Sequence, residues 1–129
     1  MKTITISEES YNTLARITKL NTEKEACALL FAKITNNGFH LESVLEVRNT
    51  RRIALSFGIS KADFEKHNNQ DLIGIFHSHF HSTTLSEKDE LIFKNKNSIQ
   101  FQLIGLKQKS LFNLFGFTNT LNNLKIKIL

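Results

Sequence analysis

Two histidines and an aspartate in this chain have the spacing of a metal site. His77 and His79 flank one serine, and Asp89 follows ten residues later. Imidazole nitrogens and a carboxylate oxygen are ligands that a catalytic zinc ion uses, with a fourth position left for water. The apolar run 71–76 is typical of a buried strand that ends at the histidines. Because alternate side chains of a strand share a face, the two imidazoles should converge there.

The segment after the histidines predicts a helix that begins beside them. Ser86-x-x-Asp89 has the form of a capping box and is followed by apolar residues at 91–93. A strand end, a short loop and a first helical turn should bring the Asp89 carboxylate back toward both imidazoles, where the helix dipole favours its ionised form. Capping alone would also explain Asp89. His81, in the intervening loop, is either a third imidazole at the site or a solvated residue.

A zinc hydrolase also needs a general base, and Glu25 is the candidate. It stands at the start of a mostly apolar run, Ala26–Ile34, that predicts a strand buried on both faces. A carboxylate at the mouth of that strand can take a proton from water at the metal if this strand lies near the histidine strand. The alternative is that Glu25 belongs to an exposed charged turn with Glu23 and Lys24.

Three other architectures that use such histidines do not fit this chain. An amidohydrolase-type barrel needs about 200 residues or more for its eight strand–helix units. A cupin-like roll would have a glutamate shortly after the second histidine, where this chain has Thr83 and Thr84. Helical zincins require His-Glu-x-x-His, which is absent from the sequence.

Composition predicts one domain, residues 1–129, of a soluble cytoplasmic protein. The chain is 40% hydrophobic and 22% charged, as expected for a globular domain. It has neither a membrane-spanning stretch nor a signal-peptide core, and its single cysteine suits a reducing compartment. The formal charge of +5 is spread thinly, with no basic run interleaved with aromatic residues. Neither a membrane nor a nucleic acid is therefore an expected partner.

The remaining patterns predict the sheet and helices that hold these residues. Strands are expected at 2–6, 26–34, 39–47, 71–79, 99–106, 110–117 and 124–129. Ser7, Ser60 and Ser86 are the predicted N-caps of helices. The expected fold class is α+β, with a mostly antiparallel (mixed) curved sheet of about six strands flanked by two or three helices.

Two local segments carry further expectations. Asn36-Asn37-Gly38 lies between two predicted strands and indicates a hairpin turn. Leu111–Phe117 is rich in large apolar residues, so it is either an ordinary core strand or part of a homodimer interface. A monomer and a homodimer both stay open.

In order along the chain, these residues resemble the signature of the JAB/MPN-domain (JAMM) zinc metalloproteases. The matching segments are Glu25-Ala-Cys-Ala-Leu-Leu30, Asn49, Phe57-Gly-Ile-Ser60, His77-Ser-His79 and Ser86-x-x-Asp89. The resemblance covers roughly residues 3–106 and is to the small prokaryotic type. It implies the MPN fold, which is cytidine-deaminase-like, and one bound zinc ion.

The resemblance implies a role for each matched residue. The zinc ligands correspond to His77, His79 and Asp89. Glu25 matches the glutamate that takes a proton from the attacking water, and Ser86 matches the serine whose hydroxyl stabilises the tetrahedral oxyanion. The segment between His79 and Ser86 is one residue shorter than is usual in the family.

The resemblance also implies an activity and a partner. Such enzymes hydrolyse the amide or isopeptide bond after the C-terminal glycine of a ubiquitin-like protein, and a sulfur-carrier protein is a further expected substrate of the small prokaryotic type. The alternative is a non-catalytic MPN module that holds such a protein, although inactive members usually lose the ligands that this chain keeps. A third option is a relative that acts in DNA repair or phage-tail processing with the same metal motif.

Overall fold

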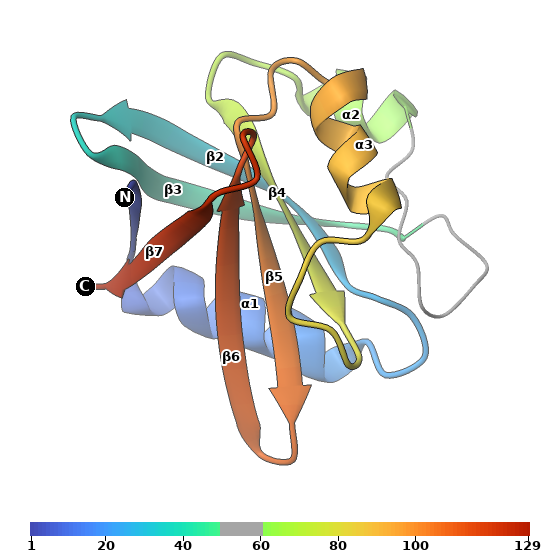
Figure 1. Ribbon diagram of the computed structural model, residues 1–129. Coiled ribbons are helices and arrows are strands. Elements are labelled where there is room, and N and C mark those ends of the chain that lie inside the picture. The colour runs from blue at the N-terminus through green and yellow to red at the C-terminus, as the bar shows by residue number, and fades with distance from the viewer. Residues whose placement is uncertain (50–60) are drawn as a thin grey trace.

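The computed structural model describes residues 1–49 and 61–129, which form a β-barrel with three helices (Figure 1). The elements, in chain order, are β1 (Thr3–Ile6), α1 (Glu8–Leu20), β2 (Cys27–Thr35), β3 (Gly38–Val47), α2 (Lys61–His67), β4 (Leu72–His79), α3 (Glu87–Asn95), β5 (Phe101–Gln108), β6 (Leu111–Thr118) and β7 (Asn123–Ile128). The strands and helices expected in this range are present, with ends shifted by at most about two residues. The matched segment Phe57–Ser60, with the predicted cap Ser60, lies outside the described residues.

The sheet is more closed than the sequence predicted. Within the described residues seven strands pair in the order β1-β3-β2-β4-β5-β6-β7, and β1 closes the ring by pairing with β7. Four pairs are antiparallel, namely β2–β3, β2–β4, β5–β6 and β6–β7, whereas β1–β3, β1–β7 and β4–β5 are parallel. The α+β class and the mixed pairing are confirmed, and the curved sheet of about six strands is corrected to a closed seven-stranded barrel.

Strand β1 is the physical reason for that difference. Three of its residues pair with β3 on one edge, in the register Ile4↔Phe39, and all four pair with β7 on the other, in the register Ile4↔Ile126. Ile4 and Ile6 are fully buried. A strand this short is held in place when both of its edges are paired, and the alternation of its sequence does not reveal which strands those partners are.

Strand β2 separates two apolar cores. Its even-numbered residues Ala28, Leu30 and Ala32 face a core that also contains Leu14 and Ile17 of α1. Cys27 and Leu29 face a second core with Phe64 of α2, Ile99, and Ile92 and Phe93 of α3. The strand is therefore buried on both faces as predicted, except at its end, where Ile34 is 66% exposed.

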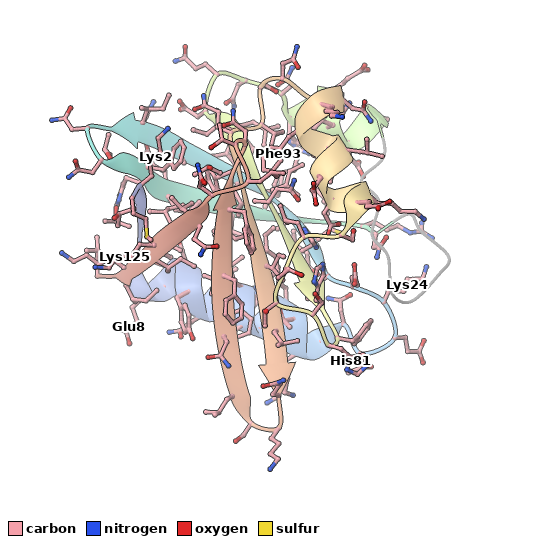
Figure 2. All side chains as sticks on the ribbon, viewed as in Figure 1. Lys2, Glu8, Lys24, His81, Phe93 and Lys125 are labelled. Atoms are coloured by element: carbon pink, nitrogen blue, oxygen red, sulfur yellow. The ribbon has the colours of Figure 1, made fainter. Side chains whose placement is uncertain are left out.

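The helices cover the two sides of the barrel. Ser7 caps α1, because its Oγ accepts a hydrogen bond from the Ser10 amide at 3.1 Å, and the helix packs against β3 and β5. On the other side Phe93 points from α3 toward the sheet (Figure 2). Lys2 and Lys125 are exposed next to each other, where the Lys125 amide donates to the Lys2 carbonyl, and Lys24 is exposed far from them (Figure 2). No helix in the described ranges has both the length and the apolar character needed to cross a bilayer.

The hairpin between β2 and β3 fixes the position of β1. Thr35 pairs with Gly38 across the two-residue turn Asn36–Asn37, as the sequence predicted. The Thr3 amide donates to the Asn37 carbonyl at 2.8 Å, and Gly38 adopts φ +149°. A Cβ at Gly38 would lie 2.1 Å from the Thr3 carbonyl oxygen. Glycine is therefore required where β1 approaches the hairpin.

We expect Gly38→Ala to destabilise the fold by about 2 kcal/mol or more, because backbone atoms of β1 must move to admit the methyl group. The measurement is urea unfolding followed by circular dichroism. Asn37→Ala is the matched control: this exposed side chain can be removed while the carbonyl that binds Thr3 is kept. Equal unfolding midpoints for the two variants would contradict the requirement for glycine.

Candidate metal centre

The two predicted histidine ligands lie side by side at the end of β4. Both belong to the strand itself, and the side chains from Leu72 to His79 are buried throughout. His77 is fully buried and His79 is 8% exposed. Their ring centroids are 4.8 Å apart with an angle of 52° between the planes. The two-residue period of the strand thus places both imidazoles on one face, as the spacing predicted.

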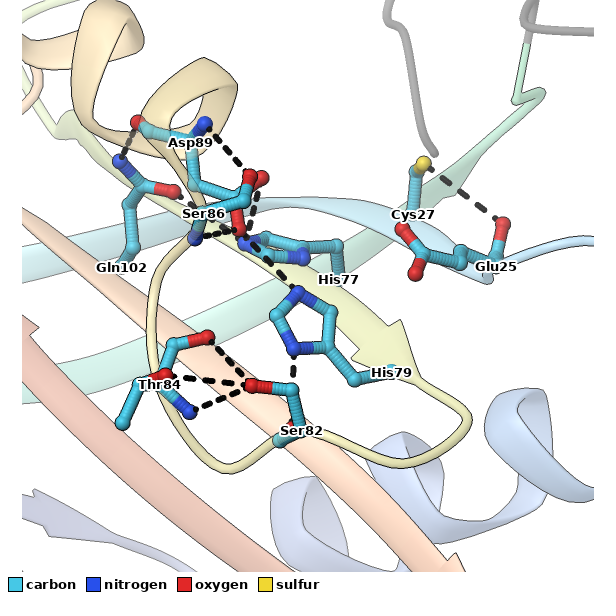
Figure 3. A network of polar contacts seen from close by, with 9 residues as sticks. All are labelled: Glu25, Cys27, His77, His79, Ser82, Thr84, Ser86, Asp89 and Gln102. Atoms are coloured by element: carbon cyan, nitrogen blue, oxygen red, sulfur yellow. Dashed lines mark hydrogen bonds and ion pairs between the residues drawn. The ribbon is translucent and has the colours of Figure 1, made fainter. Parts of the chain in front are cut away.

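Asp89 reaches these imidazoles from the first turn of α3 while also capping that helix. The Asp89 amide donates to Ser86 Oγ at 3.1 Å, and Asp89 Oδ2 accepts from the Ser86 amide at 2.8 Å, which completes the predicted capping box. The same Oδ2 lies 3.2 Å from His79 Nε2, and Oδ1 lies 3.9 Å from His77 Nε2. Capping and contact with the histidines therefore coexist in one carboxylate (Figure 3).

Glu25 lies just before β2 and is brought to the site by the β2–β4 pairing. Cys27 is opposite His77 in that ladder, and the Ser78 amide donates to the Ala26 carbonyl at 2.9 Å. Glu25 is 4% exposed, whereas its neighbours Glu23 and Lys24 are exposed. Ligand atoms of Glu25, His77 and His79 all lie within 4.8 Å of one another. The alternative that Glu25 belongs to the exposed charged turn is therefore wrong.

Buried side chains fix the backbone around Glu25. Ser78 Oγ accepts a hydrogen bond from the Ala26 amide at 2.7 Å, from the strand that carries both histidines. Asn49 Nδ2 donates to the Glu25 carbonyl at 2.8 Å. Ser78 and Asn49 are both buried. A carboxylate whose main chain is held on two sides keeps a defined direction toward the imidazoles.

The loop after β4 determines how His79 presents its ring. His79 Nδ1 lies 2.9 Å from the Ser82 carbonyl oxygen, which can only accept, so Nδ1 carries the proton and donates. The other nitrogen, Nε2, is the one that faces Asp89. This arrangement leaves Nε2 as the nitrogen that can bind a metal, because a ligating histidine usually donates its other N–H to a carbonyl or carboxylate.

Burial and mutual contact shift the protonation of all four groups. Burial lowers the pKa of His77 to about 4 and raises the pKa of Glu25 to about 7. Burial opposes charge on His79 and Asp89 as well, but their hydrogen bond raises the pKa of His79 and lowers that of Asp89. Near neutral pH His77 is thus a neutral imidazole and Asp89 is an ionised carboxylate. These are the protonation states that metal ligands require, whereas the proton that His79 Nε2 donates to Asp89 would be released when a metal binds.

Sequence reasoning missed one buried member of this network, Gln102 on β5. Its Nε2 donates to the Asp89 backbone carbonyl at 2.8 Å, and its Oε1 lies 3.2 Å from His77 Nε2 (Figure 3). The only signal in the sequence is a polar residue between Phe101 and Leu103 in an apolar strand. His81, by contrast, is exposed beyond the end of β4 (Figure 2), and among the described residues the metal-binding cluster does not include it.

The donor set fits a zinc ion. Two nitrogens and one carboxylate are a common catalytic combination, and two donors on one tetrahedral zinc lie roughly 3.3 Å apart. The separation of 3.2 Å from Asp89 Oδ2 to His79 Nε2 is close to that value. Glu25 stands at the edge of this group and also lines a cleft of about 370 Å³ with Lys24, Arg48 and Asn49.

The fold of this chain is similar to that of several proteins of known structure. No protein-family profile matches the sequence, and neither does any curated protein. The structure is similar to protein DSY2949 from Desulfitobacterium hafniense, with a TM-score of 0.73 and 17% identity over 98% of this chain and 92% of that one. It is also similar to AF2198, a JAB1/MPN domain protein from Archaeoglobus fulgidus, with a TM-score of 0.62 and 16% identity over 100% and 99% of the two chains.

A third similar structure is described as JAMM, a metalloprotease-like zinc site in the proteasome and signalosome. Its TM-score is 0.61 and its identity 14%, over 99% of each chain. At these identities the likeness shows the fold alone. The chain therefore has the fold of JAB1/MPN domain proteins, as the sequence resemblance implied.

Removal of a donor should remove the metal. We expect the wild-type protein, loaded with zinc and desalted, to hold about one ion per chain, and His79→Ala to bind zinc more weakly by more than about tenfold. Elemental analysis and competition with a chromophoric chelator measure both quantities. His81→Ala is the matched control, since it deletes an exposed imidazole two residues away. Equal zinc content in the two variants would contradict the assignment of His79.

Proposed function

We propose that this protein is a zinc-dependent peptidase or isopeptidase of the JAMM type. The observation that carries the proposal is the convergence of a buried glutamate, two imidazoles and a carboxylate in a JAB1/MPN fold. His77, His79 and Asp89 would hold one zinc ion. When bound, zinc polarises a carbonyl group and lowers the pKa of water toward about 7.

Glu25 would move the proton in this reaction. Burial raises its pKa to about 7, which suits a group that must accept a proton and give it up again near neutral pH. The carboxylate would accept a proton from the attacking water and then donate it to the departing amine. Its place between the imidazoles and the cleft lined by Arg48 and Asn49 supports this role, because substrate can approach from that side.

Ser86 would stabilise the negative charge that develops on the carbonyl oxygen. In the capping box its Oγ accepts a hydrogen bond from the Asp89 amide, so its own hydroxyl hydrogen is still available to donate. The side chain is exposed, whereas Asp89 beside it is buried. One serine would thus begin α3 and also donate to the oxyanion.

The proposed substrate is a ubiquitin-like or sulfur-carrier protein, cleaved in the cytoplasm after its C-terminal glycine. The proposal rests on the fold shared with JAB1/MPN proteins and on Glu25, His77, His79, Ser86 and Asp89, the residues that the sequence resemblance matched to the JAMM signature. A non-catalytic scaffold would need neither a buried glutamate whose pKa is about 7 nor a buried aspartate that stays ionised beside two imidazoles. The presence of both in this chain favours hydrolysis over binding alone.

The first test of this function is Glu25→Gln. The amide keeps the size of the side chain but cannot accept the proton, so we expect cleavage of a sulfur-carrier fusion to fall by about 10²-fold or more with zinc content unchanged. Mass spectrometry of the products measures cleavage, and elemental analysis measures zinc. Wild-type turnover by this variant would exclude Glu25 as the base. A wild-type protein that binds zinc but cleaves no carrier fusion would favour the scaffold.

The second test compares two helix caps. Ser86→Ala should lower kcat by about 10²- to 10³-fold, because it removes a donor to the oxyanion. Ser7→Ala removes the cap of α1, far from the site, and is the matched control. Each substitution should cost about 0.5–2 kcal/mol of stability. If Ser7→Ala slows cleavage as much as Ser86→Ala, the rate effect is one of stability and the role of Ser86 is wrong.

A further inference from the structure

Gln102 is a neutral amide buried completely in the barrel wall. Its neighbours along β5, Phe101 and Leu103, are fully buried apolar residues. Burying an amide costs free energy unless its donors and acceptor find partners. In this structure the partners come from two different elements, the Asp89 carbonyl of α3 and the His77 ring of β4.

The orientation of this amide follows from its partners. The Asp89 carbonyl oxygen can only accept, so the NH₂ group of Gln102 must face α3 and its oxygen must face His77. That oxygen accepts a hydrogen bond from His77 Nε2, which leaves Nδ1 as the His77 nitrogen that can bind a metal. In the parallel β4–β5 ladder Gln102 lies opposite Ile75, two residues before His77 on the same face of the sheet. The Gln102 side chain therefore reaches diagonally across the sheet from β5 to His77, and its NH₂ group also donates to the first turn of α3.

This bridge joins the two elements that supply different ligands. β4 carries both imidazoles and α3 carries the carboxylate, and residues 80–86 connect them. Ser82 and Thr84 in that connection are exposed. The contact from Gln102 to the Asp89 main chain is shorter, at 2.8 Å, than the contacts of 3.2 and 3.9 Å between Asp89 and the histidines.

We propose that Gln102 is a positioning residue that sets the distance between Asp89 and His77, and thereby the affinity and geometry of metal binding. The inference rests on the proposed function, because it requires these two residues to be ligands. Residues that hydrogen-bond to metal ligands without touching the metal commonly raise the metal affinity by about 10- to 100-fold. A purely structural role would be to satisfy α3 and the core, with no specific effect on the metal.

The test uses Gln102→Met, which keeps the length of the side chain but removes both hydrogen-bonding groups. We expect zinc to bind about 10- to 100-fold more weakly, with one ion per chain still bound at saturating metal. With Co²⁺ in place of zinc, the visible absorption bands should shift in position and intensity, because they report the arrangement of the ligands. Gln108→Met makes the same chemical change at an exposed position of β5 and should alter neither quantity.

Two comparisons separate positioning from stability. Ile99→Val shortens a buried residue in the core that holds α3, so it loosens the same helix without touching the amide. If Ile99→Val, at an equal loss of metal-free thermal stability, changes the Co²⁺ spectrum as Gln102→Met does, the proposal is overturned. If Gln102→Met does not fold, Gln102→Asn replaces it, since the amide is too short by one methylene to reach both partners. We then expect a smaller loss of affinity with a shifted spectrum.

The failure of this inference differs from failure of the proposed function. Unchanged zinc affinity and Co²⁺ spectrum in Gln102→Met or Gln102→Asn would overturn the role of Gln102 and leave a zinc peptidase intact. A wild-type protein that binds no stoichiometric zinc would overturn both.

Discussion

The antiparallel pairing of β2 with β4 is the constraint on which the site depends. It places Cys27 opposite His77, and the ladder continues past the end of β2, where Ser78 binds the main chain of Ala26 through both its amide and its hydroxyl. Glu25 is the next residue and is held beside the imidazoles. A slip of one residue would turn the histidines to the other face of the sheet, where the first core lies. The burial of both faces of β2 makes such a slip costly.

Several groups at the candidate metal site also hold the fold together. Asp89 completes a capping box and faces two imidazoles, and Ser86 caps the same helix while keeping a hydroxyl hydrogen to donate. Ser78 lies between the two histidines and fixes the backbone beside Glu25. The four titratable groups are buried close together, which shifts the pKa of each. A cation among them would offset that desolvation, so the site is arranged for an ion that neutralises it.

Local patterns were enough to predict much of this arrangement. The period of β4, the capping box at Ser86 and the Asn-Asn-Gly turn depend on residues close in sequence, so the chain itself reveals them. The position of Glu25 depends on β2 and β4 being neighbours, and only the family resemblance indicated it in advance. The closure of the barrel by β1 and the bridge made by Gln102 depend on partners far along the chain. Neither periodicity nor a motif encodes such partners, so both were missed.

The pairing of the first strand with the last has a consequence for how the molecule forms. β1 can pair with β3 once β3 has been synthesised, but its other edge stays unpaired until β7 has left the ribosome. Bringing together segments so distant in sequence carries a large loop-closure entropy and slows folding. The elements that carry Glu25, His77, Asp89 and Gln102 are all synthesised before that closure. The residues of the candidate metal site can therefore come together in a nascent chain while the barrel is still open, and the pairing of β7 with β1 then closes the barrel.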